Sequence, residues 1–482
     1  MNSNRRNFLK KATAGTGGLL VSGLTGYSSY NELNDSVTAN LRKSKKHKQV
    51  FNMCGYAAPK IPVVRIGYVG IGSRGSWAVD RMLNIKQIEI KALCDVREAA
   101  VKHNQQTLQK HGVAPAAEYS GALDAYKKMC ERDDIDLVYI ATPWEFHTPI
   151  AVYAMEHGKH AAIEVPAART LEEAWQLVET SERTKKHCMQ LENCCYDFFE
   201  TLTINMAQQG ALGELVHGEG AYIHALLEGM FGKPGNPTDA PVWRWKENQK
   251  NGNLYPTHGL GPVAQAMNIN RGDKFEYLTS MSSNDFMMEG LAEKLAASND
   301  PYYKQFAGKH YRGNMNTSVV KTNKGKTIMV QHDVSSPRPY TRIHTLSGTK
   351  GFAQKYPEPG RITLGHDENA DAKKMKQYEE QYTPEIIKHV ADVAKVIGGH
   401  GGMDFIMDWR MIDCLRNGLP LDMDVYDAAA WCSITPLSIW SVANRSNSID
   451  VPDFTGGSWK INKPVDLTLR GGGDTGVVEQ KK

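Results

Sequence analysis

Short apolar runs alternate with charged stretches through the first half of the chain. The apolar runs begin at Val64 and continue at residues 88–93, 137–141, 160–163 and 189–191. Charged segments such as residues 122–132 and 171–186 separate these runs, and their composition favours helices. A regular alternation of strand and helix predicts an α/β fold with a Rossmann-type, doubly wound parallel sheet. Binding sites in such sheets lie at the carboxyl ends of the strands.

The pattern changes beyond residue 196. Residues 215–226 and 316–346 favour extended strands, and Asn323-Lys324-Gly325 supplies a turn within the second segment. These features predict a second, α+β domain with an open, mainly antiparallel sheet. Residues 405–416 and 425–443 carry Trp, Met and Ile at helical spacing, which predicts C-terminal helices whose aromatic side chains pack in the core.

Charge and cysteine usage exclude several classes of partner and site. The 482 residues include 57 Lys and Arg against 53 Asp and Glu, a formal net charge of +4. Much of this excess lies near the N-terminus, so we expect no nucleic-acid partner. Eight cysteines without a Cys-x-x-Cys pair predict neither a zinc site nor a disulfide scaffold, and we expect no metal.

The N-terminal segment has the features of an export signal. Arg5 and Arg6 precede Phe8-Leu9-Lys10, and a mildly apolar, glycine-rich run follows over residues 12–24. This order resembles a twin-arginine signal, which implies the twin-arginine export machinery as a partner and a periplasmic or exported protein. The apolar run is too short and too polar for a stable membrane anchor. A disordered basic tail is the alternative interpretation.

A glycine motif at the end of the first apolar run indicates a dinucleotide site. Gly70, Gly72 and Gly75 form Gly-x-Gly-x-x-Gly, and Asp95 closes the next apolar run. The glycines permit a tight turn, a close approach to pyrophosphate and close helix packing, while the helix N-terminus offers N–H groups to phosphate. Asp95 can accept both ribose hydroxyls and would repel a 2′-phosphate. The sequence therefore predicts NAD rather than NADP.

These patterns divide the chain into five parts. We expect a signal peptide at residues 1–30, a solvated linker at 31–60, an NAD-binding Rossmann domain at 61–195, a substrate-binding domain with C-terminal helices at 196–455 and a tail at 456–482.

Polar segments follow three of the predicted strands. They are Ala141-Thr142-Pro143-Trp144-Glu145-Phe146-His147, Glu164-Val165-Pro166 and Glu192-Asn193. Because the carboxyl ends of parallel strands share one edge of the sheet, we expect these segments to surround the nicotinamide. The alternative for His147 and Glu164 is a hydrogen-bonded loop residue.

The combination of these motifs resembles a known superfamily. Ala-Thr-Pro and Glu-x-Pro at successive strand ends, followed by an open-sheet domain, are similar to the glucose–fructose oxidoreductase, inositol dehydrogenase and rhizopine catabolism superfamily over about residues 61–455. Its members usually carry Glu-Lys-Pro, with the lysine assisting proton transfer at a sugar hydroxyl. Val165 takes that place here, which counts against an ordinary sugar dehydrogenase.

Longer strings resemble one family within that superfamily. Residues 192–199 (Glu-Asn-Cys-Cys-Tyr-Asp-Phe-Phe), residues 251–262 around Tyr255-Pro256-Thr257-His258, and residues 399–404 (Gly-His-Gly-Gly-Met-Asp) look like glycoside hydrolase family 109, the NAD-dependent α-N-acetylgalactosaminidases.

The family resemblance implies roles for individual positions. Its NAD contacts correspond to Ser73, Arg74, Asp95, Trp144, Glu145, Phe146, His147, Glu164, Val165 and Asn193. Its sugar contacts correspond to Tyr222, Arg244, Tyr255, Pro256, Thr257, His258 and Tyr340. The alternative for each tyrosine is a core aromatic residue whose hydroxyl is hydrogen-bonded.

The resemblance also implies a redox-neutral reaction. Hydride leaves C3 of a terminal N-acetylgalactosamine for NAD⁺, the C2 proton becomes acidic, the C1 oxygen is eliminated, water adds, and hydride returns. NAD-dependent glycosidases are exceptions to the two-carboxylate scheme. We expect His258 to transfer the C2 proton, because imidazole titrates near working pH. We expect Tyr255 to be a second catalytic residue beside it, and Tyr222 and Arg244 to orient the sugar.

Two other functions stay open from the residues alone. One is a periplasmic NAD-dependent sugar oxidoreductase of the same superfamily, and the other is a non-catalytic sugar-binding protein. The oligomeric state is also open, although members of the superfamily often associate through the outer face of the second sheet.

Overall fold

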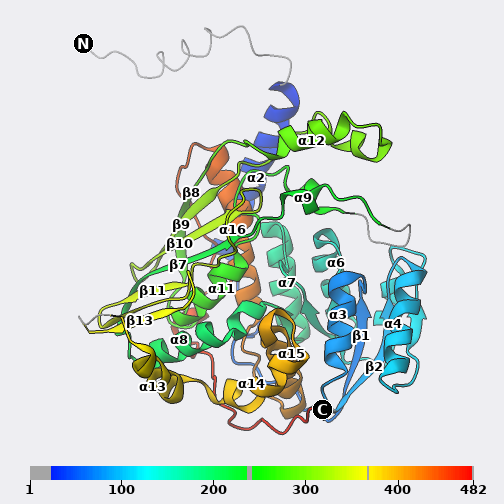
Figure 1. The fold of residues 1–482 in the computed structure, drawn as a ribbon, viewed down its shortest axis with the longest axis vertical. Coiled ribbons are helices and arrows are strands. Elements are labelled where there is room, and N and C mark those ends of the chain that lie inside the picture. Colours follow the sequence, from blue (N-terminus) through cyan, green and yellow to red (C-terminus); the bar gives the residue numbers. More distant parts are fainter. Residues whose placement is uncertain (1–22, 236–241, 366–368, 480–482) are drawn as a thin grey trace.

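The computed structural model describes residues 23–235, 242–365 and 369–479, which build two sheets connected by helices (Figure 1). The first sheet has six strands in the order β3-β2-β1-β4-β5-β6, all paired in parallel. Its strands are β1 (Val64–Val69), β2 (Ile88–Cys94), β3 (Ala117–Tyr119), β4 (Leu137–Ile140), β5 (His160–Ile163) and β6 (Cys188–Gln190). The predicted doubly wound sheet is confirmed, and β3 is an additional short strand that carries no buried apolar run.

Helices cover this sheet on its two faces. They are α3 (Ser73–Met82), α4 (Glu98–Lys110), α5 (Ala125–Cys130), α6 (His147–Glu156) and α7 (Leu171–Thr184). From the far end of the chain, α15 (Met403–Asn417) packs on α3 and β1. Residues 403–417 therefore contact the first sheet, although they follow the strands of the second domain in the sequence.

The second sheet has eight strands in the order β13-β12-β11-β7-β10-β9-β8-β14. They are β7 (Leu215–Ile223), β8 (Phe275–Ser282), β9 (Asn316–Thr322), β10 (Thr327–Asp333), β11 (Thr345–Gly348), β12 (Gly351–Gln354), β13 (Arg361–Leu364) and β14 (Ile449–Asp450). The pair β7–β10 is parallel, and the other pairs are antiparallel. The open, mainly antiparallel sheet is confirmed.

The chain after β6 also contains helices. They are α8 (Phe198–Gln208), α9 (Leu227–Met230), α10 (Arg244–Glu247), α11 (Thr257–Ala266), α12 (Met288–Ala296), α13 (Ala372–Tyr382), α14 (Glu385–Ile397) and α16 (Val425–Ala443). Short 3-10 turns add η1 (Trp144–Phe146), η2 (Asn193–Tyr196), η3 (Pro301–Phe306), η4 (His400–Gly402) and η5 (Ser458–Lys460). The almost fully buried α16 packs on α7, β6 and β8, so it joins both sheets.

The prediction of a solvated linker at residues 31–60 is wrong for this structure. Helix α2 (Gly23–Lys46) packs on α7 and α16, and Lys43 pairs with Glu179 at 2.9 Å. Leu33, Val37 and Leu41 are spaced four residues apart and form a narrow apolar stripe against the core. The polar composition of the segment conceals this stripe.

The tail is also part of the folded molecule. Trp459, Val465 and Leu467 are buried, and Val477 forms an antiparallel bridge with Ile85 beside β2. The segment around Val477 thus returns to the first domain. The predicted signal residues Arg5 and Arg6 lie outside the described residues.

Two further observations concern expectations from composition. Among the residues that the structure describes, none of the helices is both long and apolar enough to span a bilayer. All eight cysteines fall in the described ranges with free thiols, and seven of them are buried.

Candidate active site

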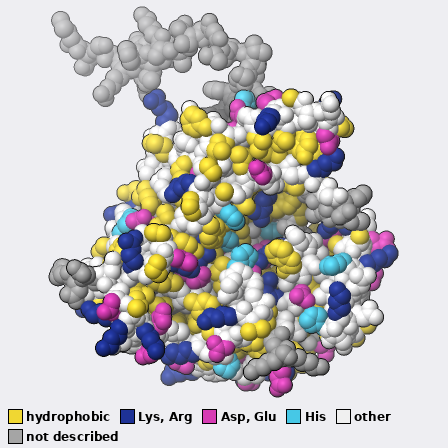
Figure 2. Space-filling model, viewed as in Figure 1, with side chains coloured by type: hydrophobic (Ala, Val, Ile, Leu, Met, Phe, Trp, Pro, Cys, Tyr) yellow, Lys and Arg dark blue, Asp and Glu magenta, His cyan; other side chains and the backbone are white. Residues whose placement is uncertain are grey.

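A cavity of about 650 Å³ lies where the carboxyl ends of the first sheet face the second domain. Figure 2 shows the molecule hollowed on this face, with hydrophobic and histidine side chains beside the opening. The predicted site residues that line it are Gly70, Gly72, Ser73, Arg74, Asp95, Trp144, Glu145, Phe146, His147, Glu164, Val165, Asn193, Tyr222, Arg244, Tyr255 and His258. The fold brings these residues together from eight separate stretches of the sequence.

One side of the cavity, which we call the nucleotide wall, consists of Gly70, Gly72, Ser73, Arg74 and Asp95. Helix α3 begins directly after the glycine turn, and no side chain caps its N-terminus. Its first N–H groups therefore remain available to an anion.

Gly75 does not line the cavity, but it determines how tightly the turn closes. A Cβ atom at this position would lie 2.0 Å from the Gly70 carbonyl oxygen. Only glycine allows α3 to pack this closely on the turn. This close packing is what the glycine motif predicts, and it fits a bound pyrophosphate.

Asp95 lies at the end of β2 and is nearly buried. Its carboxylate accepts hydrogen bonds from the N–H of Ile71 at 3.0 Å and from the N–H of Arg97 at 2.9 Å. The Arg97 side chain also reaches it, at 3.2 Å. A ribose diol at this carboxylate would have to share it with the Arg97 guanidinium.

The loop after β4 supplies Trp144 and His147, with different surroundings. Trp144 is buried and faces the second domain, where its ring stacks on Tyr255. The His147 ring nitrogens lie 2.8 Å from the Pro166 carbonyl oxygen and 2.7 Å from the Thr142 carbonyl oxygen. Burial lowers the pKa of His147. His147 therefore connects two strand-end loops, as in the alternative interpretation of this residue.

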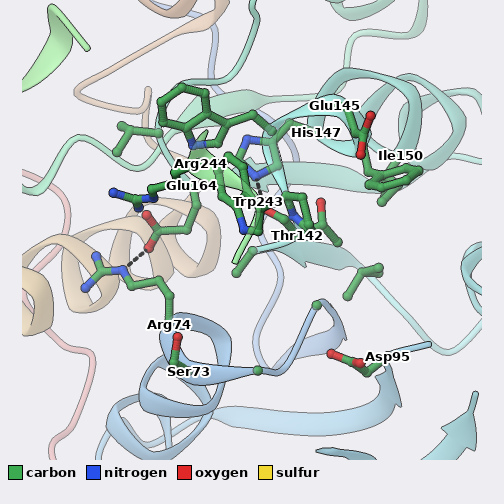
Figure 3. A pocket seen from close by; sticks show the side chains of 18 of the residues that line it. Ser73, Arg74, Asp95, Thr142, Glu145, His147, Ile150, Glu164, Trp243 and Arg244 are labelled. Atoms are coloured by element: carbon green, nitrogen blue, oxygen red, sulfur yellow. Dashed lines mark hydrogen bonds and ion pairs between the residues drawn. The ribbon is translucent and has the colours of Figure 1, made fainter. Parts of the chain in front are cut away.

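Charged side chains connect the nucleotide wall to α15. Arg74 extends from α3 to Glu164 at 2.6 Å, as Figure 3 shows, and to Asp404 at 2.8 Å. Asp404 also accepts from Asn193 at 2.5 Å and pairs with His400 at 2.8 Å. Burial opposes its ionisation, but His400 and Arg74 hold the pKa of Asp404 well below its usual value.

Asp404 and His400 have no role in the predicted site. Both stand in the Gly-His-Gly-Gly-Met-Asp string, which was the available signal. Their link to Arg74 depends on α15 packing against α3, which sequence spacing does not reveal.

The opposite side of the cavity, which we call the sugar wall, consists of Trp144, Tyr222, Arg244, Tyr255 and His258. The Tyr255 ring lies 5.6 Å from Trp144, 4.8 Å from Tyr222 and 4.8 Å from His258. The Arg244 guanidinium lies over Trp144 at 5.8 Å. Burial raises the pKa of Tyr255 well above its usual value, against the opposing effect of Arg244. The Tyr255 hydroxyl is therefore a proton-bearing group at neutral pH.

His258 is held by Glu192, a carboxylate that the sequence places beside the nicotinamide but to which it assigns no role. Its Nδ1 lies 2.7 Å from Oε1 of Glu192, which is fully buried at the end of β6. Burial opposes ionisation of Glu192, but the charge and hydrogen bond of His258 hold the pKa of Glu192 below its usual value. A hydrogen bond at Nδ1 leaves Nε2 as the nitrogen for proton transfer in the cavity.

Close backbone packing places His258. A Cβ atom on the next residue, Gly259, would lie 2.1 Å from the N–H nitrogen of Ala221. Glycine thus lets α11 lie directly on β7 and brings His258 beside Tyr222, with ring centres 5.3 Å apart.

The same corner contains one cluster of potential metal ligands among the described residues. Glu192, Cys194 and His258 each offer one ligand atom, and these atoms lie within 4.8 Å of one another. Burial raises the pKa of the Cys194 thiol well above its usual value. The hydrogen bond between Glu192 and His258 accounts for the positions of two of these three residues.

Three of the predicted sugar contacts do not line this cavity. Pro256 and Thr257 are buried at the start of α11 and position the residues beside them. Tyr340 lines a neighbouring cavity, with its ring 6.3 Å from that of Tyr222.

Comparisons with known proteins agree with the two-part architecture. Residues 64–191 match the family described as oxidoreductase family, NAD-binding Rossmann fold. Residues 196–461 match the family described as glycosyl hydrolase 109, C-terminal domain.

Curated relatives extend this similarity over most of the chain. An alpha-N-acetylgalactosaminidase of Bacteroides fragilis is 49% identical over 422 residues, which cover 86% of this chain and 98% of the relative. A glycosyl hydrolase family 109 protein of Shewanella sp. is 44% identical over 475 residues, which cover 97% of this chain and 99% of the relative.

Solved structures share the fold at low sequence identity. A levoglucosan dehydrogenase in complex with NADH and levoglucosan has a TM-score of 0.59 at 18% identity, covering 81% of this chain and 100% of its own. An NAD-binding oxidoreductase from Klebsiella pneumoniae has a TM-score of 0.62 at 16% identity, covering 82% and 100%.

Proposed function

The chain belongs to glycosyl hydrolase family 109, and from this premise we propose that it hydrolyses terminal α-N-acetylgalactosamine residues of glycoconjugates by a redox-neutral, NAD-dependent cycle. One observation carries the proposal: a wall suited to a dinucleotide faces a histidine held by a buried carboxylate across a single cavity. The dinucleotide wall supports hydride exchange with a sugar carbon, and the histidine supports proton transfer at the neighbouring carbon.

The residues present fit NAD. The uncapped N-terminus of α3 suits the pyrophosphate, and the close packing at Gly75 leaves the turn open to it. When bound, NAD supplies a hydride acceptor and later a hydride donor at C3 of the sugar. A ketone at C3 makes the C2–H bond acidic.

Residues of the sugar wall then transfer protons and orient the sugar. Nε2 of His258 takes the C2 proton, while Glu192 stabilises the imidazolium that results. Elimination breaks the bond between C1 and the leaving oxygen. One water supplies both the proton that this oxygen takes up and the hydroxyl that adds to C1, and the His258 imidazolium returns its proton to C2. Tyr255 stays protonated and donates a hydrogen bond to a sugar oxygen, and Tyr222 and Arg244 orient the ring.

The carboxylates of the cavity do not support the usual glycosidase scheme. Most glycosidases place two carboxyl groups on either side of the scissile bond. Here Glu164 is paired with Arg74, and Asp95 is paired with Arg97 on the nucleotide side. Proton transfer through His258 does not need a second carboxylate at the sugar.

A sugar oxidoreductase is the competing function. Val165 is buried and apolar where a lysine would assist a dehydrogenase, and it packs with the aromatic sugar wall. An oxidoreductase would accumulate NADH during turnover, whereas the proposed cycle regenerates NAD⁺. A steady absorbance increase at 340 nm with a free sugar would favour the oxidoreductase.

Export belongs to the same proposal. Arg5 and Arg6 match the twin-arginine pattern, and that route carries folded proteins, so the enzyme could bind its cofactor before export. Replacing both arginines by lysine should leave the protein in the cytoplasmic fraction. Unchanged secretion would contradict this part of the proposal.

Isotope incorporation tests the mechanism. Hydrolysis of an aryl α-N-acetylgalactosaminide in heavy water should place deuterium at C2 of the released sugar, because the C2 proton exchanges at His258. NMR or mass spectrometry of the product measures this incorporation, and free N-acetylgalactosamine incubated without enzyme is the control. Released sugar with only hydrogen at C2 would exclude elimination.

A further inference from the structure

A second cavity of about 590 Å³ adjoins the first. Its lining residues come from the start of α8, from the segment around Tyr340, from the loop after β12 and from η4: Asp197, Phe198, Phe199, Tyr340, Arg342, Lys355, Tyr356, Glu358, Pro359, Gly360, His400, Gly401 and Met403. His400 lines both cavities. The two spaces therefore meet at the edge of the active site.

Tyr340 connects the sugar wall to the second cavity. Its ring lies 6.3 Å from Tyr222 on one side and 6.2 Å from Tyr356 on the other. Tyr340 is 37% exposed, so its ring is accessible to a ligand. A ligand that contacts Tyr222 and extends past Tyr340 enters the second cavity.

The charges under this cavity are balanced. Arg342 contacts Asp197 at 2.8 Å and Glu200 at 2.6 Å. Lys355 contacts the same two carboxylates at 2.6 Å and 3.0 Å. Two cations and two anions close a buried quartet, so neither cation is left to bind a phosphate, sulfate or sialic acid carboxylate.

The remaining surface suits a neutral, hydroxylated ring. Tyr340, Tyr356 and Phe199 present aromatic faces on which the C–H side of a sugar can pack. The Arg342 guanidinium donates to the Tyr340 hydroxyl at 3.1 Å and keeps that ring in place. Arg342 and Lys355 also lie over the Tyr356 ring, at 5.6 Å and 5.4 Å.

We propose that this second cavity binds a neutral sugar residue of the leaving group, the one to which the terminal N-acetylgalactosamine is attached. The orientation of that sugar rests on the proposed glycosidase function, whereas its binding in the cavity does not. The enzyme therefore prefers neutral oligosaccharides over glycopeptides in which the same terminal sugar is linked directly to serine or threonine.

Kinetics with two substrates test this proposal. Tyr356→Ala should reduce kcat/KM about tenfold for a neutral trisaccharide with terminal α-N-acetylgalactosamine, as expected for loss of one well-packed aromatic contact, and change it less than about twofold for the aryl glycoside. Tyr356→Phe, which keeps the ring, should behave like the wild type with both substrates. The matched control is Tyr277→Ala, an exposed tyrosine on β8 that lines neither cavity.

The outcomes are distinct. Equal losses with both substrates, no loss with the trisaccharide, or a larger loss with the aryl glycoside would each overturn the proposal. Saturation-transfer NMR with the neutral disaccharide leaving group makes a test that needs no hydrolysis. Signal with the wild type that is lost in Tyr356→Ala supports the subsite even if the glycosidase reaction fails, and the absence of signal with the wild type rejects it.

Discussion

The nucleotide wall and the sugar wall face each other across one cavity but are built differently. The nucleotide wall depends on backbone geometry within residues 70–75, where glycines bring a helix N-terminus close to the ligand. The sugar wall depends on side chains from η1, β7, α10 and α11, which meet only in the folded protein. Damage to the first should therefore affect cofactor binding, and damage to the second should affect turnover with the cofactor still bound.

The largest expected effect is on the sugar wall. His258→Ala should lower kcat about a thousandfold, or about 4 kcal/mol, because a general base contributes 10²–10⁴-fold. NAD content, measured by mass spectrometry of the denatured protein, should stay at the wild-type level. His310→Ala, which changes an exposed histidine, is the control. Loss of NAD together with turnover would show that the two walls are not independent.

The charged quartet of Asp197, Glu200, Arg342 and Lys355 lies under the second cavity, and its effect should appear in the free energy of unfolding. Burial opposes ionisation of Glu200, but Arg342 and Lys355 lower its pKa to about 2. Because the folded-state value lies below the unfolded one, the stabilisation is complete above about pH 4.5 and is lost as pH falls toward 2.

Glu200→Gln should therefore reduce the free energy of unfolding by about 3 kcal/mol at pH 7. The variant should also lose less stability than the wild type between about pH 4.5 and pH 2. Denaturant unfolding at several pH values measures both. Parallel pH profiles for the two proteins would contradict the assignment.

The nucleotide wall has the next expected effect. Gly75→Ala should weaken NAD binding on the order of a hundredfold, or about 3 kcal/mol, because the new Cβ displaces α3 from the turn and costs about two hydrogen bonds to phosphate. Calorimetry or fluorescence titration with NAD measures the change. Gly290→Ala in α12 adds a Cβ into open space and is the matched control. Normal NAD affinity with reduced turnover would contradict the assignment of the nucleotide wall to cofactor binding.

The smallest expected effect distinguishes two roles of Glu192, holding His258 in place and stabilising its imidazolium. Glu192→Gln should lower kcat about tenfold, since a neutral amide still holds His258 in place but no longer stabilises the imidazolium. Steady-state kinetics measure kcat in the variant. A wild-type kcat would show that Glu192 only positions the ring.

Local patterns were sufficient for much of the fold. The alternation of apolar and charged runs predicts the parallel sheet, and the glycine motif predicts the turn at Gly70 and the packing at Gly75. The same reasoning fails for residues 31–60, where three apolar positions spaced four apart do not stand out from a polar composition. It also gives no sign that residues 403–417 return to β1.

The sequence by itself determined the two sheets, the dinucleotide turn and the residue types available for proton transfer, because these depend on neighbours within a few positions along the chain. Only the tertiary structure decided that Glu192 holds His258, that Asp404 completes the network around Arg74, and that Tyr340 stands between two cavities. Each of these contacts joins side chains separated by long stretches of chain. Their geometry follows from how α11, α15 and β7 pack, and packing is a property of the whole fold rather than of any segment.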